Sequence, residues 1–587
     1  MQALLSIEDL SVDFITNQQT THAVKNISLQ VSRGEVLAIV GESGSGKSVT
    51  SLSILQLLPK PPAKFSNGKI FFRDGSVQLE LISATPKQIG EIRGSKIAMI
   101  FQEPMSSLNP LMSCGNQVKE TVLLHKKISS AEAKQQTIEW FEKVKLPDPE
   151  KIFYRYPHEL SGGQKQRVMI AMAMCCHPSL LICDEPTTAL DVTVQKTILQ
   201  LIKELQEQEN IGVIFITHDL GVVAEIASRV AIMFEGQIVE QNTVENIFLN
   251  PQHAYTKALI ACRPAQHPKN EPLPTVGDFL SDPMRNSTSG SAGVSLSSGA
   301  RSLTSDKLIQ VKNLVVKFPG KTNLLGKPKT YFTAVDDVSF EIYKGETVGL
   351  VGESGCGKTT LGRTLLRLIE PASGKIFYLD RDITHFSKDD LKPLRKDVQL
   401  IFQDPYSSLN PRLTIGDAIA EPMKITGGEK NDRERKKKVA ELLERVSLSA
   451  AMMNRYPHEF SGGQRQRIVI ARAISINPGF IVCDESVSAL DVSVQAQVLN
   501  LLNELKDQLE LTLLFISHDL SVVHYMCNRI MVMNKGKIIE SGAADDVYYR
   551  PQHHYTRQLI EAIPSLAPAI STARGKGDMD STQHIHV

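Results

Sequence analysis

Gly41-Glu-Ser-Gly-Ser-Gly-Lys47-Ser48 and Gly352-Glu-Ser-Gly-Cys-Gly-Lys358-Thr359 decide the fold of this chain of 587 residues. Both match the pattern G-x-x-x-x-G-K-[ST]. In it, glycines let backbone N–H groups surround phosphate, the lysine reaches the outer phosphates, and the hydroxyl can bind Mg²⁺. Each segment follows an apolar stretch predicted to be a strand (36–40; 347–351) and precedes a predicted helix. Phosphate would therefore lie at a helix N-terminus in each of two α/β cores.

The two segments belong to longer blocks that repeat along the chain. Lys47 and Lys358 are 311 residues apart, whereas His218 and His518 are 300 apart. Offsets this similar indicate one domain that has been duplicated. The difference between these two offsets corresponds to extra residues in the first half near Gly75. We interpret these residues as a longer connection between strands.

Composition excludes several classes of protein. The formal net charge is +1 with 22% charged residues, so the basic surface of a nucleic-acid binder is not expected. The eight cysteines show no C-x-x-C spacing, which argues against a zinc site and against a disulfide framework. There is no signal-peptide pattern, and no apolar run approaches the ~18 residues of a membrane span. The chain is expected to be cytosolic by itself.

Two units with a similar internal order follow from the repeat. Each begins with β-like alternation (5–14; 309–318) and later contains a mostly helical stretch (115–158; 414–458), which predicts an α/β nucleotide-binding core with an inserted helical subdomain. A stretch rich in Ser and Gly separates them and reads as flexible. The expected divisions are a first domain, a flexible linker, a second domain and a disordered tail: 1–263, 264–306, 307–563 and 564–587.

Paired carboxylates end a predicted strand in each half, at 180–184 and 480–484. A buried parallel strand delivers such acids to its C-terminal edge, where ligands bind. ATP hydrolysis needs a metal and an oriented water. Asp184 and Asp484 are therefore expected to organise Mg²⁺, and Glu185 and Glu485 to polarise the attacking water.

A second candidate anion site precedes these acids. Ser-Gly-Gly-Gln begins an apolar helix in each half, so backbone N–H groups at a helix N-terminus face a possible γ-phosphate. A simple helix cap is the alternative, although a cap does not require Gly-Gly-Gln after the serine. The residues are Ser161, Gly162, Gly163 and Gln164, and Ser461, Gly462, Gly463 and Gln464.

Together these motifs resemble the ATPase domains of ABC transporters over nearly the whole chain outside the linker and tail. The resemblance implies two tandem P-loop domains, each a RecA-like α/β core with an N-terminal antiparallel β subdomain and an inserted helical subdomain. It also implies that the domains pair head to tail around two ATP molecules. The Lys47 site would be completed by the segment at Ser461, and the Lys358 site by the segment at Ser161.

Four further pairs match positions of that family. The resemblance implies a glutamine that senses the metal, a histidine at the γ-phosphate, an aspartate that communicates across the dimer, and an aromatic ring on adenine. For the aromatic pair, core packing is an alternative because such residues are common in strands. The pairs, in that order, are Gln102 and Gln403, His218 and His518, Asp191 and Asp491, and Phe14 and Phe318.

Neither half has lost a residue that the family uses for catalysis, so both are expected to hydrolyse ATP. Two positions depart from the family pattern: Ser486 replaces proline, and Cys356 replaces the serine of the first loop. The remaining residues expected to bind nucleotide or metal in the two loops are Gly41, Ser43, Gly44, Gly46, Lys47 and Ser48, and Gly352, Ser354, Gly355, Gly357, Lys358 and Thr359.

Shorter cues suggest a branch of the family. Ser-Ser-Leu-Asn-Pro (106–110; 407–411) and Pro-Gln-His-x-Tyr-Thr (251–256; 551–556) occur in both halves. They are similar to the oligopeptide, dipeptide and nickel importer branch, in which glutathione and microcin C importer ATPases have fused domains. The resemblance implies an ATPase that uses ATP and Mg²⁺ to drive peptide import.

The partners implied are two transmembrane permease subunits and an extracytoplasmic substrate-binding protein, with no nucleic acid. The chain would lie peripherally on the cytoplasmic face of a bacterial inner membrane. A fused sugar-importer ATPase and a soluble ribosome-associated tandem ATPase are the alternatives.

Overall fold

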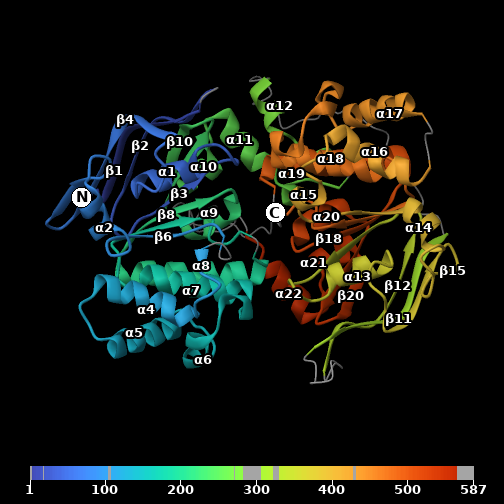
Figure 1. Cartoon of the computed structure of the whole chain (residues 1–587), viewed down its shortest axis with the longest axis horizontal. Helices are drawn as coiled ribbons and strands as arrows, with labels where there is room; N and C mark the ends of the chain where they lie inside the picture. The colour runs from blue at the N-terminus through green and yellow to red at the C-terminus, as the bar shows by residue number, and fades with distance from the viewer. Residues whose placement is uncertain are drawn as a thin grey trace, which may run out of the picture.

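The structure is a computed structural model. It describes residues 3–16, 19–103, 107–188, 190–269, 271–281, 306–320, 330–427, 431–488 and 490–564. Two halves of the same architecture lie side by side, one coloured blue to green and the other yellow to red (Figure 1). The expected tail, 564–587, lies outside the described residues except for residue 564.

Each half begins with a four-stranded antiparallel sheet, as expected. Along β1, Leu5, Ile7, Leu10 and Val12 are buried, and the shift in their spacing coincides with a register shift between Ile7 and Leu10. The strand orders are β2-β1-β4-β5 and β12-β11-β14-β15. Their bounds are β1 Leu5–Ile15, β2 Thr20–Val31, β4 Ala63–Asp74 and β5 Val77–Glu80, then β11 Lys307–Pro319, β12 Tyr331–Tyr343, β14 Ser373–Tyr378 and β15 Arg381–Asp382.

A six-stranded sheet forms the core of each half. Four of its five pairings are parallel, and its central strands are buried apolar runs, as a sheet covered on both faces requires. The orders are β10-β9-β3-β8-β7-β6 and β16-β17-β18-β13-β19-β20. In the first half the bounds are β3 Val36–Val40, β6 Ile97–Ile100, β7 Leu180–Asp184, β8 Gly212–Thr217, β9 Arg229–Phe234 and β10 Gln237–Thr243. In the second they are β13 Thr347–Val351, β16 Val398–Ile401, β17 Phe480–Asp484, β18 Thr512–Ser517, β19 Arg529–Asn534 and β20 Lys537–Ala543.

Helices cover these sheets and form the expected helical subdomain, α4–α6 in the first half and α16–α17 with η4 in the second. The first half has α1 Lys47–Ile54, α2 Pro86–Ile92, α4 Cys114–His125, α5 Ser130–Lys143, α6 Pro149–Tyr154, η1 Pro157–Glu159, α7 Gly162–Met174, α8 Val192–Glu209, α9 Leu220–Ile226, α10 Val244–Leu249, α11 Ala254–Ala261, η2 Pro264–Gln266 and α12 Val276–Ser281. The second has α13 Lys358–Leu365, α14 Leu391–Asp397, α15 Pro405–Ser408, α16 Ile415–Ile425, α17 Asp432–Arg445, η4 Ala450–Asn454, η5 Pro457–Glu459, α18 Gly462–Ile474, α19 Val492–Leu509, α20 Leu520–Met526, α21 Ala544–Tyr549 and α22 His554–Glu561.

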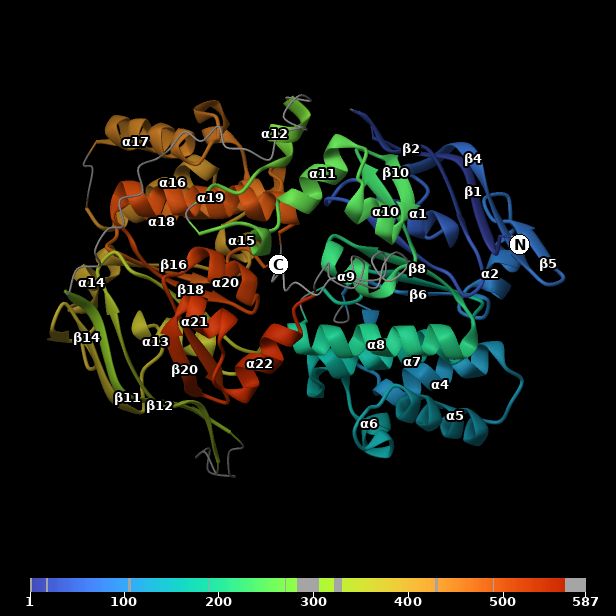
Figure 2. The same ribbon diagram turned by 180° about the vertical axis from the view of Figure 1, so that it is seen from behind.

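The halves are turned relative to each other. In Figures 1 and 2, α4, α5 and α6 lie at the lower edge of the molecule, whereas α16 and α17 lie at the upper edge. The carboxyl-terminal helix α22 of the second half reaches α8 of the first, where Lys196 Nζ donates to the Glu561 carbonyl at 2.8 Å. No helix among the described residues is long and apolar enough to cross a membrane.

Residues 264–269 and 271–281, which we call the strap, differ from the expected flexible linker. They contain η2 and α12: α12 packs on α11 of the first half, whereas η2 packs on α20 of the second (Figure 2). Leu273 exchanges two hydrogen bonds with the Asn500 side chain, at 2.8 and 2.7 Å. The Tyr525 hydroxyl donates to the Glu271 carbonyl at 2.6 Å, and Lys269 pairs with Asp545 at 2.6 Å.

The strap is ordered because it carries its own apolar contacts. Leu273 and Val276 are buried in an apolar cluster that contains residues of both halves. This short apolar pattern was hidden in the sequence by the proline-rich and Ser/Gly-rich composition around it. The rest of the expected linker, residues 282–305, lies outside the described residues.

Candidate functional site

Each phosphate loop joins the central strand β3 or β13 to the N-terminus of α1 or α13. The N-cap residues are Gly46 and Gly357, with φ of 101° and 110°. A Cβ atom at these positions would lie 2.6 Å from the Ala23 carbonyl and 2.3 Å from the Ala334 carbonyl. Glycine is therefore required by both the left-handed backbone and the close approach of a neighbouring strand.

A buried lysine lies within each loop. Lys47 Nζ donates to the carbonyls of Gly41 and Glu42, at 2.7 and 2.9 Å. Lys358 makes the same two bonds, at 2.7 and 2.9 Å, in the second half. The loop is open beside Gly44 and Gly355, where a Cβ atom would meet nothing within 4 Å. Each loop therefore offers a cationic cradle lined by backbone, which suits phosphate.

The loop hydroxyls meet the first acid of each pair. Ser48 Oγ donates to Asp184 at 3.0 Å, and Thr359 Oγ1 donates to Asp484 at 2.8 Å. Burial raises the pKa of Asp184 to about 6 and raises the pKa of Asp484 as well. A hydroxyl beside a carboxylate is a set of hard oxygen donors, so these residues fit Mg²⁺.

The second acid lies at the centre of a hydrogen-bonded group. Gln102 Nε2 donates to Glu185 at 2.9 Å, the Thr188 hydroxyl donates to it at 2.9 Å, and His218 Nδ1 lies 3.4 Å away. Burial raises the pKa of Glu185, but the hydrogen bond and charge of His218, with Thr188 and Lys47, outweigh burial and lower the pKa to about 2. In return, burial lowers the pKa of His218, but the hydrogen bond and charge of Glu185 outweigh it and raise that pKa. Glu185 is thus held ionised.

The second half repeats this group with one difference. Gln403 Nε2 donates to Glu485 at 2.7 Å, and His518 Nδ1 lies 3.6 Å from Glu485. The Ser488 hydroxyl donates to the backbone carbonyl of Glu485, at 3.0 Å, and not to its carboxylate.

Both of these glutamates adopt a left-handed backbone. Glu185 has φ of 48° and Glu485 has φ of 49°. Such a backbone is costly for a residue with a Cβ atom, and residues held in strained conformations cluster at active and binding sites. It persists at Glu485 although Ser486 replaces the proline that follows Glu185, so the substitution leaves the position of the acid intact.

The Ser-Gly-Gly-Gln segments begin α7 and α18 as helix caps. Ser161 Oγ accepts from the Gln164 N–H at 3.3 Å, and Gln164 Oε1 accepts from the Ser161 N–H at 3.1 Å. The same capping box is present at Ser461 and Gln464. Between described residues, no hydrogen bond or ion pair joins the Ser461 segment to the Lys47 loop. A role in binding nucleotide therefore remains a proposal.

The two expected D-loop aspartates reach across the boundary between halves. Asp491 accepts hydrogen bonds from the Ser43 N–H at 3.0 Å and from the Ser43 hydroxyl at 3.2 Å. Asp191 accepts from the Ser354 N–H in the same way. The phosphate loop of each half is thus in contact with the other half.

An adjacent pair of contacts was not foreseen from the sequence. The Thr193 hydroxyl donates to the Glu353 carboxylate at 2.6 Å, and the Ser493 hydroxyl donates to Glu42. The signal was available, because Thr193 and Ser493 recur at the same 300-residue offset as the histidines.

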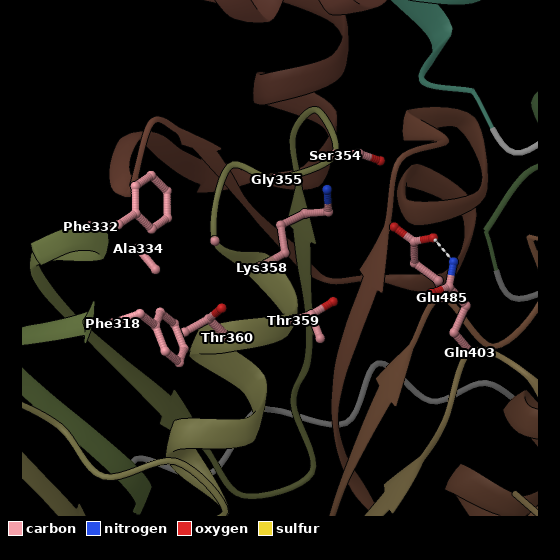
Figure 3. A pocket seen from close by; sticks show the side chains of 11 residues that line it. Phe318, Phe332, Ala334, Ser354, Gly355, Lys358, Thr359, Thr360, Gln403 and Glu485 are labelled. Carbon is pink, nitrogen blue, oxygen red and sulfur yellow. Dashed lines mark hydrogen bonds between the residues drawn. The ribbon is translucent and has the colours of Figure 1, made fainter. Parts of the chain in front are cut away.

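A pocket of about 350 Å³ lies beside the phosphate loop of the second half. Figure 3 shows Phe318 and Phe332 at one end, Glu485 and Gln403 at the other, and Lys358 between them. Phe318, the residue whose ring is expected to stack on adenine, therefore lines this pocket. Phe332 was not foreseen, because its strand partner is Phe318 in the second half whereas Thr21 pairs with Phe14 in the first. Phe14 is half-buried against the apolar core of its own half.

Comparisons with known proteins support a family assignment. The model for "ABC transporter" matches residues 24–188 and 335–488, and that for "Oligopeptide/dipeptide transporter, C-terminal region" matches 239–290 and 539–586. The glutathione import ATP-binding protein GsiA of Pectobacterium atrosepticum is 47% identical over 569 residues, covering 96% of this chain and 90% of that protein. GsiA of Escherichia coli O157:H7 is also 47% identical, over 576 residues, with the same coverage. A solved dimeric ATP-binding cassette bound to ADP and Pi is 27% identical, covers 40% of this chain and 99% of that chain, and has a TM-score of 0.37.

Proposed function

The chain belongs to the ABC transporter family as the ATPase subunit of a peptide importer, and we propose that both of its halves hydrolyse ATP. One observation carries this proposal. Each half brings together the same set of side chains with the same partners, around Lys47 in one half and Lys358 in the other. The set comprises the loop lysine, the loop hydroxyl, the two acids, the glutamine and the histidine.

The residues divide the chemistry among them. Lys47 and the N-terminus of α1 hold the phosphates. Glu185, kept ionised and fixed by Gln102 and His218, orients and polarises the attacking water. The corresponding residues of the second half do the same.

We propose that Mg²⁺ binds at Ser48 with Asp184 and at Thr359 with Asp484. There Mg²⁺ would supply positive charge to offset the negative charge that develops on the phosphate oxygens. Gln102 and Gln403, each joined to the second acid, would report on the metal to the helical subdomains. Loss of Mg²⁺-dependent nucleotide binding in Asp184→Asn and Asp484→Asn would support this assignment, and unchanged Mg²⁺ dependence would contradict it.

We also propose that the halves pair head to tail, with each ATP between the loop of one half and the Ser-Gly-Gly-Gln segment of the other. The contacts of Asp491 with Ser43 and of Asp191 with Ser354 support this arrangement, because they bring each loop to the other half. The hydrogen bonds of the strap to Asn500 and of Lys196 to Glu561 add further contacts that hold the two halves against each other.

The partners would be two permease subunits and an extracytoplasmic substrate-binding protein, with the chain on the cytoplasmic face of a bacterial inner membrane. The matches to the oligopeptide/dipeptide C-terminal region in both halves favour this branch over a fused sugar importer or a ribosome-associated ATPase. The substrate we propose is glutathione or a peptide of similar size, as the names of the relatives suggest.

Purification of the tagged chain from detergent-solubilised membranes tests the partner assignment. Two permease polypeptides should copurify, and glutathione or short peptides presented with the binding protein should stimulate ATP hydrolysis, whereas maltose should not. Sedimentation with ribosomes and without permeases would contradict the importer assignment. Stimulation by a sugar alone would contradict the peptide assignment.

A further inference from the structure

A tyrosine from outside the matched ATPase regions contacts each phosphate loop. The Glu42 N–H donates to the Tyr255 hydroxyl at 3.1 Å, and the Glu353 N–H donates to the Tyr555 hydroxyl at 3.0 Å. Tyr255 and Tyr555 lie in the regions that match the oligopeptide/dipeptide C-terminal model, 239–290 and 539–586. The contact therefore links a region without an assigned task to the nucleotide site.

The repeated Pro-Gln-His-x-Tyr-Thr segment fixes this tyrosine. Glu240 accepts from the backbone N–H groups of Gln252 and His253, at 2.9 and 3.0 Å. His253 in turn caps α11, because its Nδ1 accepts from the Tyr255 N–H at 3.2 Å. The Tyr255 ring packs on Phe234, with ring centroids 4.3 Å apart. The second half repeats these bonds with Glu540, Gln552, His553 and Tyr555.

The loop residue held by each tyrosine is also one that meets the other half. The Glu42 carboxylate accepts a hydrogen bond from the Ser493 hydroxyl, and the Glu353 carboxylate accepts one from the Thr193 hydroxyl. The next residue, Ser43 or Ser354, donates to the opposite D-loop aspartate. The tyrosine thus holds the backbone of the loop next to the residue that contacts the other half.

Burial suits the phenols to this task. Tyr255 is fully buried and Tyr555 is half-buried. Burial raises the pKa of both well above the usual value, so each phenol stays protonated, and its oxygen accepts the N–H of the loop. An N–H in this partly buried position that lost its acceptor would lose the free energy of that hydrogen bond.

We propose that Tyr255 and Tyr555 are positioning residues that hold the second residue of each phosphate loop, so that the loop binds ATP and contacts the other half at the same time. The C-terminal region of each half is then a support for its own nucleotide site. This inference rests on the proposed function, because it assumes that the two loops bind ATP.

Tyr555→Phe tests the proposal, since it keeps the ring and removes only the hydroxyl. We expect the ATP concentration for half-maximal hydrolysis to rise about 10-fold while kcat changes by less than about threefold, because the lost contact supports binding before chemistry. Tyr378→Phe is the matched control: its hydroxyl bonds Asp397 in the same half, away from the loop. Equal effects of the two variants on half-saturation would overturn the proposal.

A double-mutant cycle separates positioning from a general loss of stability. Thr193 contacts the same Glu353 that Tyr555 holds, so Thr193→Ala should add little once Tyr555→Phe is present. Ser493 contacts Glu42 in the other loop, so Ser493→Ala should act independently of Tyr555→Phe. Independent effects in both pairs would overturn the proposal. Failure of the proposed function is recognised separately, as an unaltered chain that does not hydrolyse ATP.

Discussion

The Asp491 carboxylate accepts two hydrogen bonds from Ser43, through its backbone N–H at 3.0 Å and its hydroxyl at 3.2 Å, across the boundary between the halves. Asp491 is the N-cap residue of α19, yet its side chain makes no bond to the first turn of that helix. The same is true of Asp191 at α8. Each aspartate therefore uses its acceptors on the opposite loop instead of capping its own helix.

Replacing Asp491 with alanine should slow ATP turnover about 10-fold, because the Ser43 N–H and hydroxyl both lose a charged acceptor. Steady-state ATP hydrolysis by the full chain measures this. Asp507→Ala, an exposed position on the same helix, should leave the rate unchanged. A rate for Asp491→Ala within twofold of the unaltered chain would show that the contact has no functional role.

The different partners of Thr188 and Ser488 predict unequal effects of equivalent substitutions. The Thr188 hydroxyl bonds the Glu185 carboxylate, whereas the Ser488 hydroxyl bonds only a backbone carbonyl. Thr188→Ala should lower kcat about 5- to 10-fold, since it frees the acid that orients water. Ser488→Ala should lower it less than about twofold. Equal losses in the two variants would contradict this difference between the sites.

The strap predicts a stability effect confined to one half. Asn500→Ala removes both partners of the Leu273 backbone and should cost about 2 kcal/mol of unfolding free energy. Gln200, the equivalent residue of the first half, is exposed, so Gln200→Ala is the matched control. Urea denaturation measures the cost. Hydrogen exchange at 271–281 should accelerate only in Asn500→Ala, and unchanged exchange would show that these bonds do not hold the strap.

Phe332 is expected to stack on the adenine base in the second half, whereas the first half has Thr21 at the matching position. Its large exposed ring lines the pocket at the end opposite Glu485. Phe332→Thr, which introduces the residue type found at Thr21 in the first half, should weaken ATP binding at this site about 5- to 10-fold, the lower end of what a base–aromatic stacking contact contributes. Binding of a fluorescent ATP analogue measures the change. Tyr331→Thr removes a neighbouring exposed ring outside the pocket and should have little effect, so a similar loss in both variants would rule out stacking on Phe332.

Much of the fold and most of the candidate site could be predicted from the sequence. The loop glycines, the apolar strands before them and the Asp-Glu ends of β7 and β17 are local patterns with one physical meaning each. Because these patterns recur at a nearly constant offset, chance is a poor explanation for any one of the motif matches. Gln102 and His218 do meet Glu185, although they lie 83 and 33 residues away in the sequence.

What could not be predicted depends on contacts between distant segments. The strap is held by Asn500 and Tyr525, whose counterparts in the first half are Gln200 and Glu225, so the repeat gave no signal for it. Tyr255 was visible only as part of a motif typical of one branch, because nothing local relates it to Glu42, 213 residues away.

Steady-state ATP hydrolysis by Glu185→Gln, Glu485→Gln and the double variant tests the central claim, that both halves hydrolyse ATP. Each single substitution keeps the shape of the side chain but replaces one acceptor oxygen with an NH₂ group and removes the charge that we propose polarises water. If both sites act, each single variant should fall to about half of the original turnover or lower, and the double variant should lose at least about 100-fold. A single variant with unaltered turnover would contradict the claim, since it would show that its half does not hydrolyse ATP.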